Sequence, residues 1–83
     1  MRVHLIHGLH TGKEGGVMAA LKPYFDDKGY VTVLHHYAYA RVGLNWLFNS
    51  SRAAKIIKSV KEGDVLVGHS NGCTIAYKIQ EQI

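Results

Sequence analysis

Three short apolar runs alternate with longer segments of helical periodicity along the chain. The runs cover residues 3–7, 30–34 and 65–67, and glycine stands at the boundary of each run. Their β-branched content and their glycine boundaries are typical of strands. None of the runs alternates strictly between apolar and polar positions, which predicts a sheet covered on both faces.

Helical spacing of apolar residues predicts a helix after each strand. The first helix covers residues 14–28, and Pro23 should kink it or divide it near Lys22. The third helix begins near Asn71 and continues toward Ile83. The resulting order, β-α-β-α-β-α, predicts a three-layer α/β domain with a parallel sheet and right-handed crossovers.

The second helix, predicted over residues 44–62, is amphipathic. Its apolar face comprises Ala53, Ile56, Ile57 and Val60. Four basic residues spaced by three are predicted on the opposite, solvated face: Arg52, Lys55, Lys58 and Lys61. An anion-binding surface is the alternative interpretation of these four. The formal net charge is +4, but the other basic residues are scattered, so we predict no nucleic-acid partner.

The composition is that of one small globular domain, with 83 residues of which 47% are hydrophobic and 19% charged. A single cysteine, Cys73, excludes an internal disulfide. No apolar run approaches the roughly 20 residues that span a bilayer, and no signal peptide is recognisable, so a cytoplasmic location is expected. The last helical pattern reaches Ile83 without a capping glycine or proline. We therefore expect residues 1–83 to be a single partial domain, truncated in this helix.

The strongest candidate for chemistry is the segment Gly68-His69-Ser70-Asn71-Gly72, which matches the pattern G-x-S-x-G. A serine on a sharp turn between a strand and a helix needs neighbours without bulky side chains two residues away on both sides. Glycine meets that need at both positions. A predicted strand precedes the segment and a predicted helix follows it, which is the context this motif requires. The alternative is a structural or phosphate-binding glycine turn.

With His7-Gly8 directly after the first strand and the serine motif after the third, nearly all of the chain resembles the N-terminal part of the α/β-hydrolase family. The resemblance implies the strand order 2-1-3. The loop after the first strand and the serine turn would then meet at the switch point where open α/β sheets bind ligands.

The resemblance also implies a role for each matching residue. Ser70 would be the nucleophile that attacks an acyl carbonyl, and the backbone N–H groups of Asn71 and Leu9 would form the oxyanion hole. His10 and His69 are candidate substrate contacts, and His69 is predicted to pack below the turn. His7 is expected to shape the loop rather than to transfer protons. No cofactor is implied.

The acid and the histidine of the triad follow the serine in that family. All six histidines here precede Ser70, and the only acidic residue after it, Glu81, lies roughly 16 Å along a helix. The upstream candidates for a substitute base are His10, His35 and His36. We predict a serine hydrolase with esterase-, lipase- or thioesterase-like activity on a small-molecule acyl substrate, inactive or nearly so as this fragment alone. The alternative is a non-catalytic truncated domain that serves as an interaction module or is a remnant.

Two rival sites fit the residues less well. A phosphate-binding P-loop needs four residues between its glycines, but Gly8 and Gly12 enclose three, and Glu14 stands where a hydroxyl residue is needed. His4, His7 and His10 are spaced by three, yet no cysteine or carboxylate cluster completes a metal-ligand set. The sequence therefore predicts no metal site.

Overall fold

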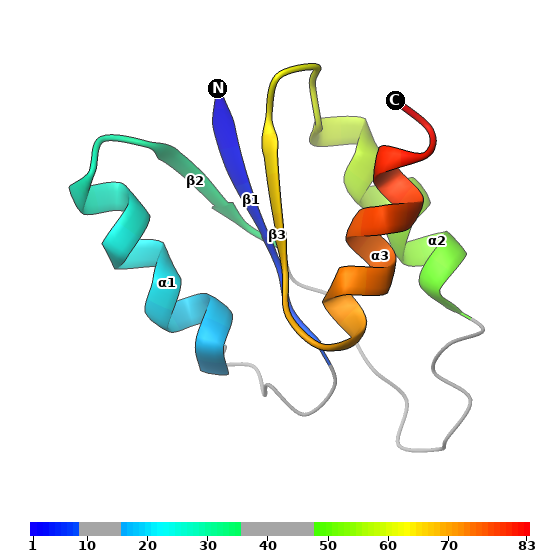
Figure 1. Ribbon diagram of the computed structural model, residues 1–83, viewed down its shortest axis with the longest axis horizontal. Helices are drawn as coiled ribbons and strands as arrows, with labels where there is room; N and C mark the ends of the chain where they lie inside the picture. Colours follow the sequence, from blue (N-terminus) through cyan, green and yellow to red (C-terminus); the bar gives the residue numbers. More distant parts are fainter. Residues whose placement is uncertain (9–15, 36–47) are drawn as a thin grey trace.

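A computed structural model of the chain describes residues 1–8, 16–35 and 48–83. The elements in chain order are β1 (Arg2–Ile6), α1 (Gly16–Asp27), β2 (Val31–Leu34), α2 (Asn49–Ile56), the 3₁₀ turn η2 (Ile57–Ser59), β3 (Val65–Gly68) and α3 (Asn71–Gln80). Figure 1 shows α1 on one side of the sheet and α2 with α3 on the other. The described residues thus form a small three-layer α/β fold, as the alternating pattern predicts.

The three strands form one parallel sheet with the order β2-β1-β3, which confirms the predicted order 2-1-3. The register sets Leu34 of β2 opposite Leu5 of β1, and Gly68 of β3 opposite Ile6. Because parallel strands end at a common edge, the residues that follow β1 and β3 meet there. That edge carries Gly8 and the serine turn.

Side chains of β1 alternate between two apolar clusters, one on each face of the sheet. On one face, Val3 and Leu5 pack with Met18 of α1. On the other face, Ile6 packs with residues of α2 and α3: Ala53, Ile56, Ile75 and Ile79. The apolar pattern of β1 therefore reflects burial on both faces, with His4 as the one buried polar residue within the strand.

The helix α1 runs from Gly16 to Asp27 and includes Pro23, so Pro23 does not divide the helix, and a kink there stays a prediction. Proline removes one backbone hydrogen bond from a helix interior. Apolar side chains on both sides of Pro23 pack against the same cluster on the sheet, and they hold the two halves in one helix: Met18, Leu21 and Phe25.

The helix α2 ends at Ile56, earlier than the predicted end near residue 62, and η2 follows it. Val60 is already extended, with φ −94° and ψ 133°. Local side-chain hydrogen bonds compete with continuation of the helix. Ser59 Oγ donates to the carbonyl oxygen of Ile56 at 3.0 Å, and the Lys61 N–H donates to Asp64 Oδ2 at 2.9 Å. The predicted start near residue 44 lies outside the described residues.

The basic series of α2 is not a uniform solvated face. Lys55, Lys58 and Lys61 are exposed, but Arg52 is only 7% exposed and donates from Nη1 to Asn49 Oδ1 at 3.0 Å. The prediction that Arg52 lies on a solvated face was wrong, because its guanidinium group bonds to Asn49 on the same helix. At the far end of the chain, α3 stops at Gln80, short of Ile83. None of the helices in the described ranges is long and apolar enough to span a bilayer.

Candidate active site at the serine turn

Ser70 occupies the turn between β3 and α3 in an unusual backbone conformation. Its φ is 57° and its ψ is −125°, and no other non-glycine residue among those described has a positive φ. Such a conformation costs a residue with a Cβ roughly 1–3 kcal/mol, and it persists only where the surroundings enforce it. The Ser70 side chain is exposed. The turn therefore holds a reactive side-chain type in a strained and accessible position.

The glycines on both sides of Ser70 permit this turn. A Cβ on Gly68 would lie 2.6 Å from the carbonyl oxygen of Gly72, and a Cβ on Gly72 would collide with the carbonyl oxygen of Ile6. The first turn of α3 thus lies against the backbone of β1 and of β3. The steric need for glycine that the motif predicts therefore arises from these specific backbone contacts.

The loop that follows β1 reaches the serine turn at Gly8. A Cβ on Gly8 would stand 2.6 Å from the Ser70 Cβ and 3.1 Å from the Asn71 backbone nitrogen. His7 is buried, and its Nδ1–H donates to the Gly8 carbonyl oxygen at 3.1 Å. The structure therefore brings together the His7-Gly8 segment and the serine turn, the two segments that carry the resemblance to the α/β-hydrolase family. Leu9 and His10, predicted as an oxyanion donor and a substrate contact, lie outside the described residues.

A pair of asparagines joins α2 to the start of α3. Asn49 Nδ2 donates to Asn71 Oδ1 at 2.9 Å, and Asn71 Nδ2 donates to Asn49 Oδ1 at 2.8 Å. Asn49 is 2% exposed, and Arg52 donates to the same Oδ1 atom. The Asn71 side chain, next to Ser70, is thereby held in one orientation. Sequence reasoning missed Asn49, because hydrophobic periodicity carries no signal for a polar partner 22 residues away.

His69 precedes the nucleophile candidate and is exposed, so the prediction that it packs below the turn was wrong. β3 ends at Gly68, and His69 lies beyond the covered part of the sheet. Its backbone N–H donates to the Ile6 carbonyl oxygen at 3.2 Å, which extends the ladder between β1 and β3. The role of its side chain as a substrate contact stays a prediction.

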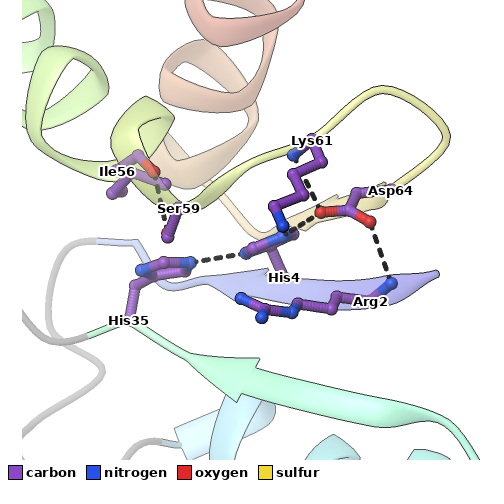
Figure 2. Close-up of polar contacts among 7 residues, drawn as sticks. All are labelled: Arg2, His4, His35, Ile56, Ser59, Lys61 and Asp64. Atoms are coloured by element: carbon purple, nitrogen blue, oxygen red, sulfur yellow. Dashed lines mark hydrogen bonds and ion pairs between the residues drawn. The ribbon is translucent and has the colours of Figure 1, made fainter.

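A second polar cluster lies inside the same domain, on the face that α2 and α3 cover (Figure 2). His4 Nε2 bonds to Asp64 Oδ2 at 2.9 Å, and His4 Nδ1 bonds to His35 Nε2 at 2.9 Å. The two imidazole rings lie edge to edge and nearly coplanar, with 18° between their planes and 5.1 Å between their centroids. His4 is 0% exposed and the Asp64 side chain 5% exposed. We call these three residues the Asp64–His4–His35 chain.

Three hydrogen bonds hold the pKa of Asp64 far below its usual range. The largest effect comes from the Arg2 backbone N–H, followed by His4 and then the Lys61 backbone N–H. The Arg2 N–H reaches Oδ1 at 3.0 Å, and the Lys61 N–H reaches Oδ2 at 2.9 Å. Sequence reasoning missed Asp64, which stands 60 residues from His4 and whose position directly before a strand carries no signal for this partner.

Both ring nitrogens of His4 are engaged in this chain, and one ring nitrogen of His35 is bound to His4. His36, a further candidate for a substitute base, lies outside the described residues. Within the described part of the chain, no group of three or more His, Cys, Asp or Glu side chains is arranged to hold a metal ion.

Comparisons with protein-family models, with curated proteins and with solved structures find no match for this chain.

Proposed function

We propose that the chain carries the nucleophile of a serine hydrolase of the α/β-hydrolase type, acting on esters, thioesters or related acyl bonds, with Ser70 Oγ as the attacking atom. One observation carries the proposal. Ser70 has φ 57° and ψ −125° on an exposed turn between a parallel strand and a helix. Strain of this kind concentrates at functional positions, and here it coincides with the G-x-S-x-G pattern.

The position of the turn in the sheet supports the same role. β3 lies beside the central strand β1, while β2 lies on the other side of β1. The chain therefore changes direction across the sheet between these strands, and such a switch point is where open α/β sheets bind ligands. Gly8 and Ser70 both stand at this edge.

A developing oxyanion needs N–H donors close to the nucleophile. Asn71 is the first residue of α3, so its N–H belongs to the positive end of a helix dipole. Gly8 approaches this nitrogen closely, which brings the loop after β1 to the same place. In the proposed mechanism the Asn71 N–H is one donor and the Leu9 N–H is the other. The Asn49–Asn71 amide pair would keep the turn in its reactive geometry.

A serine hydroxyl is a weak nucleophile without a base that accepts its proton. His4 is fully engaged by Asp64 and His35, so it does not serve as that base. The proposed mechanism therefore needs an acid and a base other than His4 and Asp64. These 83 residues alone are expected to be inactive or nearly so.

Labelling with a fluorophosphonate probe tests the proposal in the full-length gene product. An activated Ser70 should react with the probe, and Ser70→Ala should abolish the labelling. Ser50→Ala is the matched control, since Ser50 is also exposed but lies in α2; it should label like the wild type. Absence of labelling in the wild type would refute the mechanism and favour the non-catalytic alternative.

A further inference from the structure

The Asp64–His4–His35 chain reaches across all three strands and is not used by the proposed hydrolase chemistry. Asp64 precedes β3, His4 lies within β1, and His35 directly follows β2. Figure 2 shows the three side chains in a row, with Asp64 also over the N-terminal end of β1 at Arg2. The proton positions in this row determine what it can do.

Hydrogen-bond chemistry fixes most of these protons. The Asp64 carboxylate accepts bonds from the two backbone N–H groups of Arg2 and Lys61, and an ionised carboxylate only accepts. The His4 Nε2 atom must therefore be the donor to Asp64. Between His4 Nδ1 and His35 Nε2, which are 2.9 Å apart, there is room for one proton.

The histidine pair can exist in two proton states without losing this bond. When both rings are neutral, His35 Nε2–H donates to His4 Nδ1. When the pair has taken up one further proton, His4 Nδ1–H donates to His35 Nε2, and the positive charge lies beside the Asp64 carboxylate. A second added proton would place two N–H groups face to face at 2.9 Å, so the bond must break.

The charges on the described elements around the pair disfavour a second positive charge. Asp64 is the carboxylate that the structure places in contact with the pair, and one cation already neutralises it. Apart from Asp64, the charged residues of β1, of the turn before β3 and of the helices on this face are almost all basic: Arg2, Arg52, Lys55, Lys58, Lys61, Glu62 and Lys78. Lys55, Lys58, Lys61 and Glu62 are exposed, and Arg52 is bound to Asn49. A second positive charge beside the buried His4 and these basic residues would be unfavourable.

We propose that the Asp64–His4–His35 chain is an acid-operated latch that holds the C-terminal end of β2 against β1. The latch stays closed in the first two proton states and opens when the pair takes up its second additional proton. Histidine is the side chain whose charge ordinarily changes between about pH 5 and 8, so mild acid is the expected signal. The inference does not depend on the proposed hydrolase activity.

The backbone offers a reporter on each side of β1. The His35 N–H donates to the Leu5 carbonyl oxygen at 3.1 Å, and the His69 N–H donates to the Ile6 carbonyl oxygen at 3.2 Å. Both bonds extend the parallel ladder at the same edge, but only His35 belongs to the latch. Opening should therefore expose the His35 amide while the His69 amide stays bonded.

Amide hydrogen exchange followed by NMR between about pH 7 and 4.5 tests this latch, with each rate divided by its intrinsic value. In the wild type, the protection of the His35 amide should fall by about tenfold or more relative to that of His69. An unchanged ratio over this range would overturn the proposal. So would a parallel loss at both amides, because it would indicate global unfolding rather than local release.

Two substitutions separate the latch from other acid effects. His35→Gln keeps an amide N–H donor for His4 but takes up no proton, so protection at position 35 should become independent of pH. His69→Gln removes an exposed histidine outside the latch and should leave the response of His35 unchanged. If His35→Gln does not fold, ring ¹⁵N shifts of wild-type His4 and His35 decide the matter. Protonation of both rings with the His35 amide still protected would contradict the latch.

Discussion

The serine turn and the Asp64–His4–His35 chain are two polar sites that both contact the central strand β1, but they differ in exposure, strain and bonding. Ser70 is exposed, and its backbone is strained at the edge of the sheet. His4 is fully buried, in a relaxed strand, with both ring nitrogens bonded. Exposure with strain suits a group that must react with a ligand, whereas burial with complete bonding suits a group that holds elements together. Close backbone contacts hold the first site in place, and hydrogen bonds that depend on protonation hold the second.

The sharpest way to test this contrast is to disturb the backbone contact that supports the serine turn. Gly72→Ala places a methyl group against the Ile6 carbonyl oxygen, so α3 must move away from β1. We expect the free energy of unfolding to fall by about 3 kcal/mol or more, or folding to fail. Urea denaturation followed by circular dichroism measures this change.

Gly63→Ala is the matched control for that substitution. Gly63, unlike Gly72, has a positive φ, of 91°, but a Cβ there meets no atom within 4 Å. Its cost should therefore be limited to the backbone strain of about 1 kcal/mol. A loss for Gly72→Ala no larger than that for Gly63→Ala would show that the contact with β1 does not constrain the serine turn.

A smaller effect is expected where the serine turn depends on side chains. Asn49→Ala removes both amide bonds to Asn71 and one bond from Arg52, in a position that is 2% exposed. Loss of these partners should lower the free energy of unfolding by roughly 1–3 kcal/mol. Ser50→Ala, at the exposed neighbouring position, should change it by less than about 0.5 kcal/mol. An Asn49→Ala variant as stable as Ser50→Ala would disprove a tight connection between α2 and α3.

The contribution of the Asp64–His4–His35 chain to stability should depend on pH mainly in acid. The pKa of Asp64 lies below its unfolded value of about 3.9, chiefly because the Arg2 backbone N–H and then His4 bond to the ionised form. Between the folded and the unfolded pKa of Asp64, the unfolded state therefore binds more protons than the folded state. Stability is fully present above about pH 4 and is lost as the pH falls toward the folded pKa.

Urea denaturation of the wild type and of Asp64→Asn between about pH 2 and 5 measures this dependence. The substitution should flatten the acid-induced loss of stability. Asp26→Asn is the control, because the carboxylate of Asp26 pairs with Lys22 on the exposed surface of α1, where such pairs contribute little. Asp26→Asn should flatten the curve less than Asp64→Asn does. The opposite order would place the dominant acid-sensitive group outside the buried chain.

Hydrophobic periodicity predicted the strands closely, because strands buried on both faces must be apolar at successive positions. It was less reliable at helix boundaries. Pro23 did not divide α1, because packing on both sides outweighed one missing hydrogen bond. The helix α2 ended early at Ile56, because Ser59 and Asp64 offered the backbone other partners. These outcomes depend on a balance of small local energies that a pattern of apolar residues does not contain.

The amino-acid sequence by itself determined the order of strands and helices and the steric requirement for glycine on both sides of Ser70. Both follow from short-range rules, since burial sets the apolar spacing and the turn sets the space around each Cα. Only the tertiary structure decided that Asn49 pairs with Asn71 and that His4 joins Asp64 to His35. Partners that are 22 to 60 residues apart meet only after the sheet register and the helix packing are set, and small changes in either would separate them.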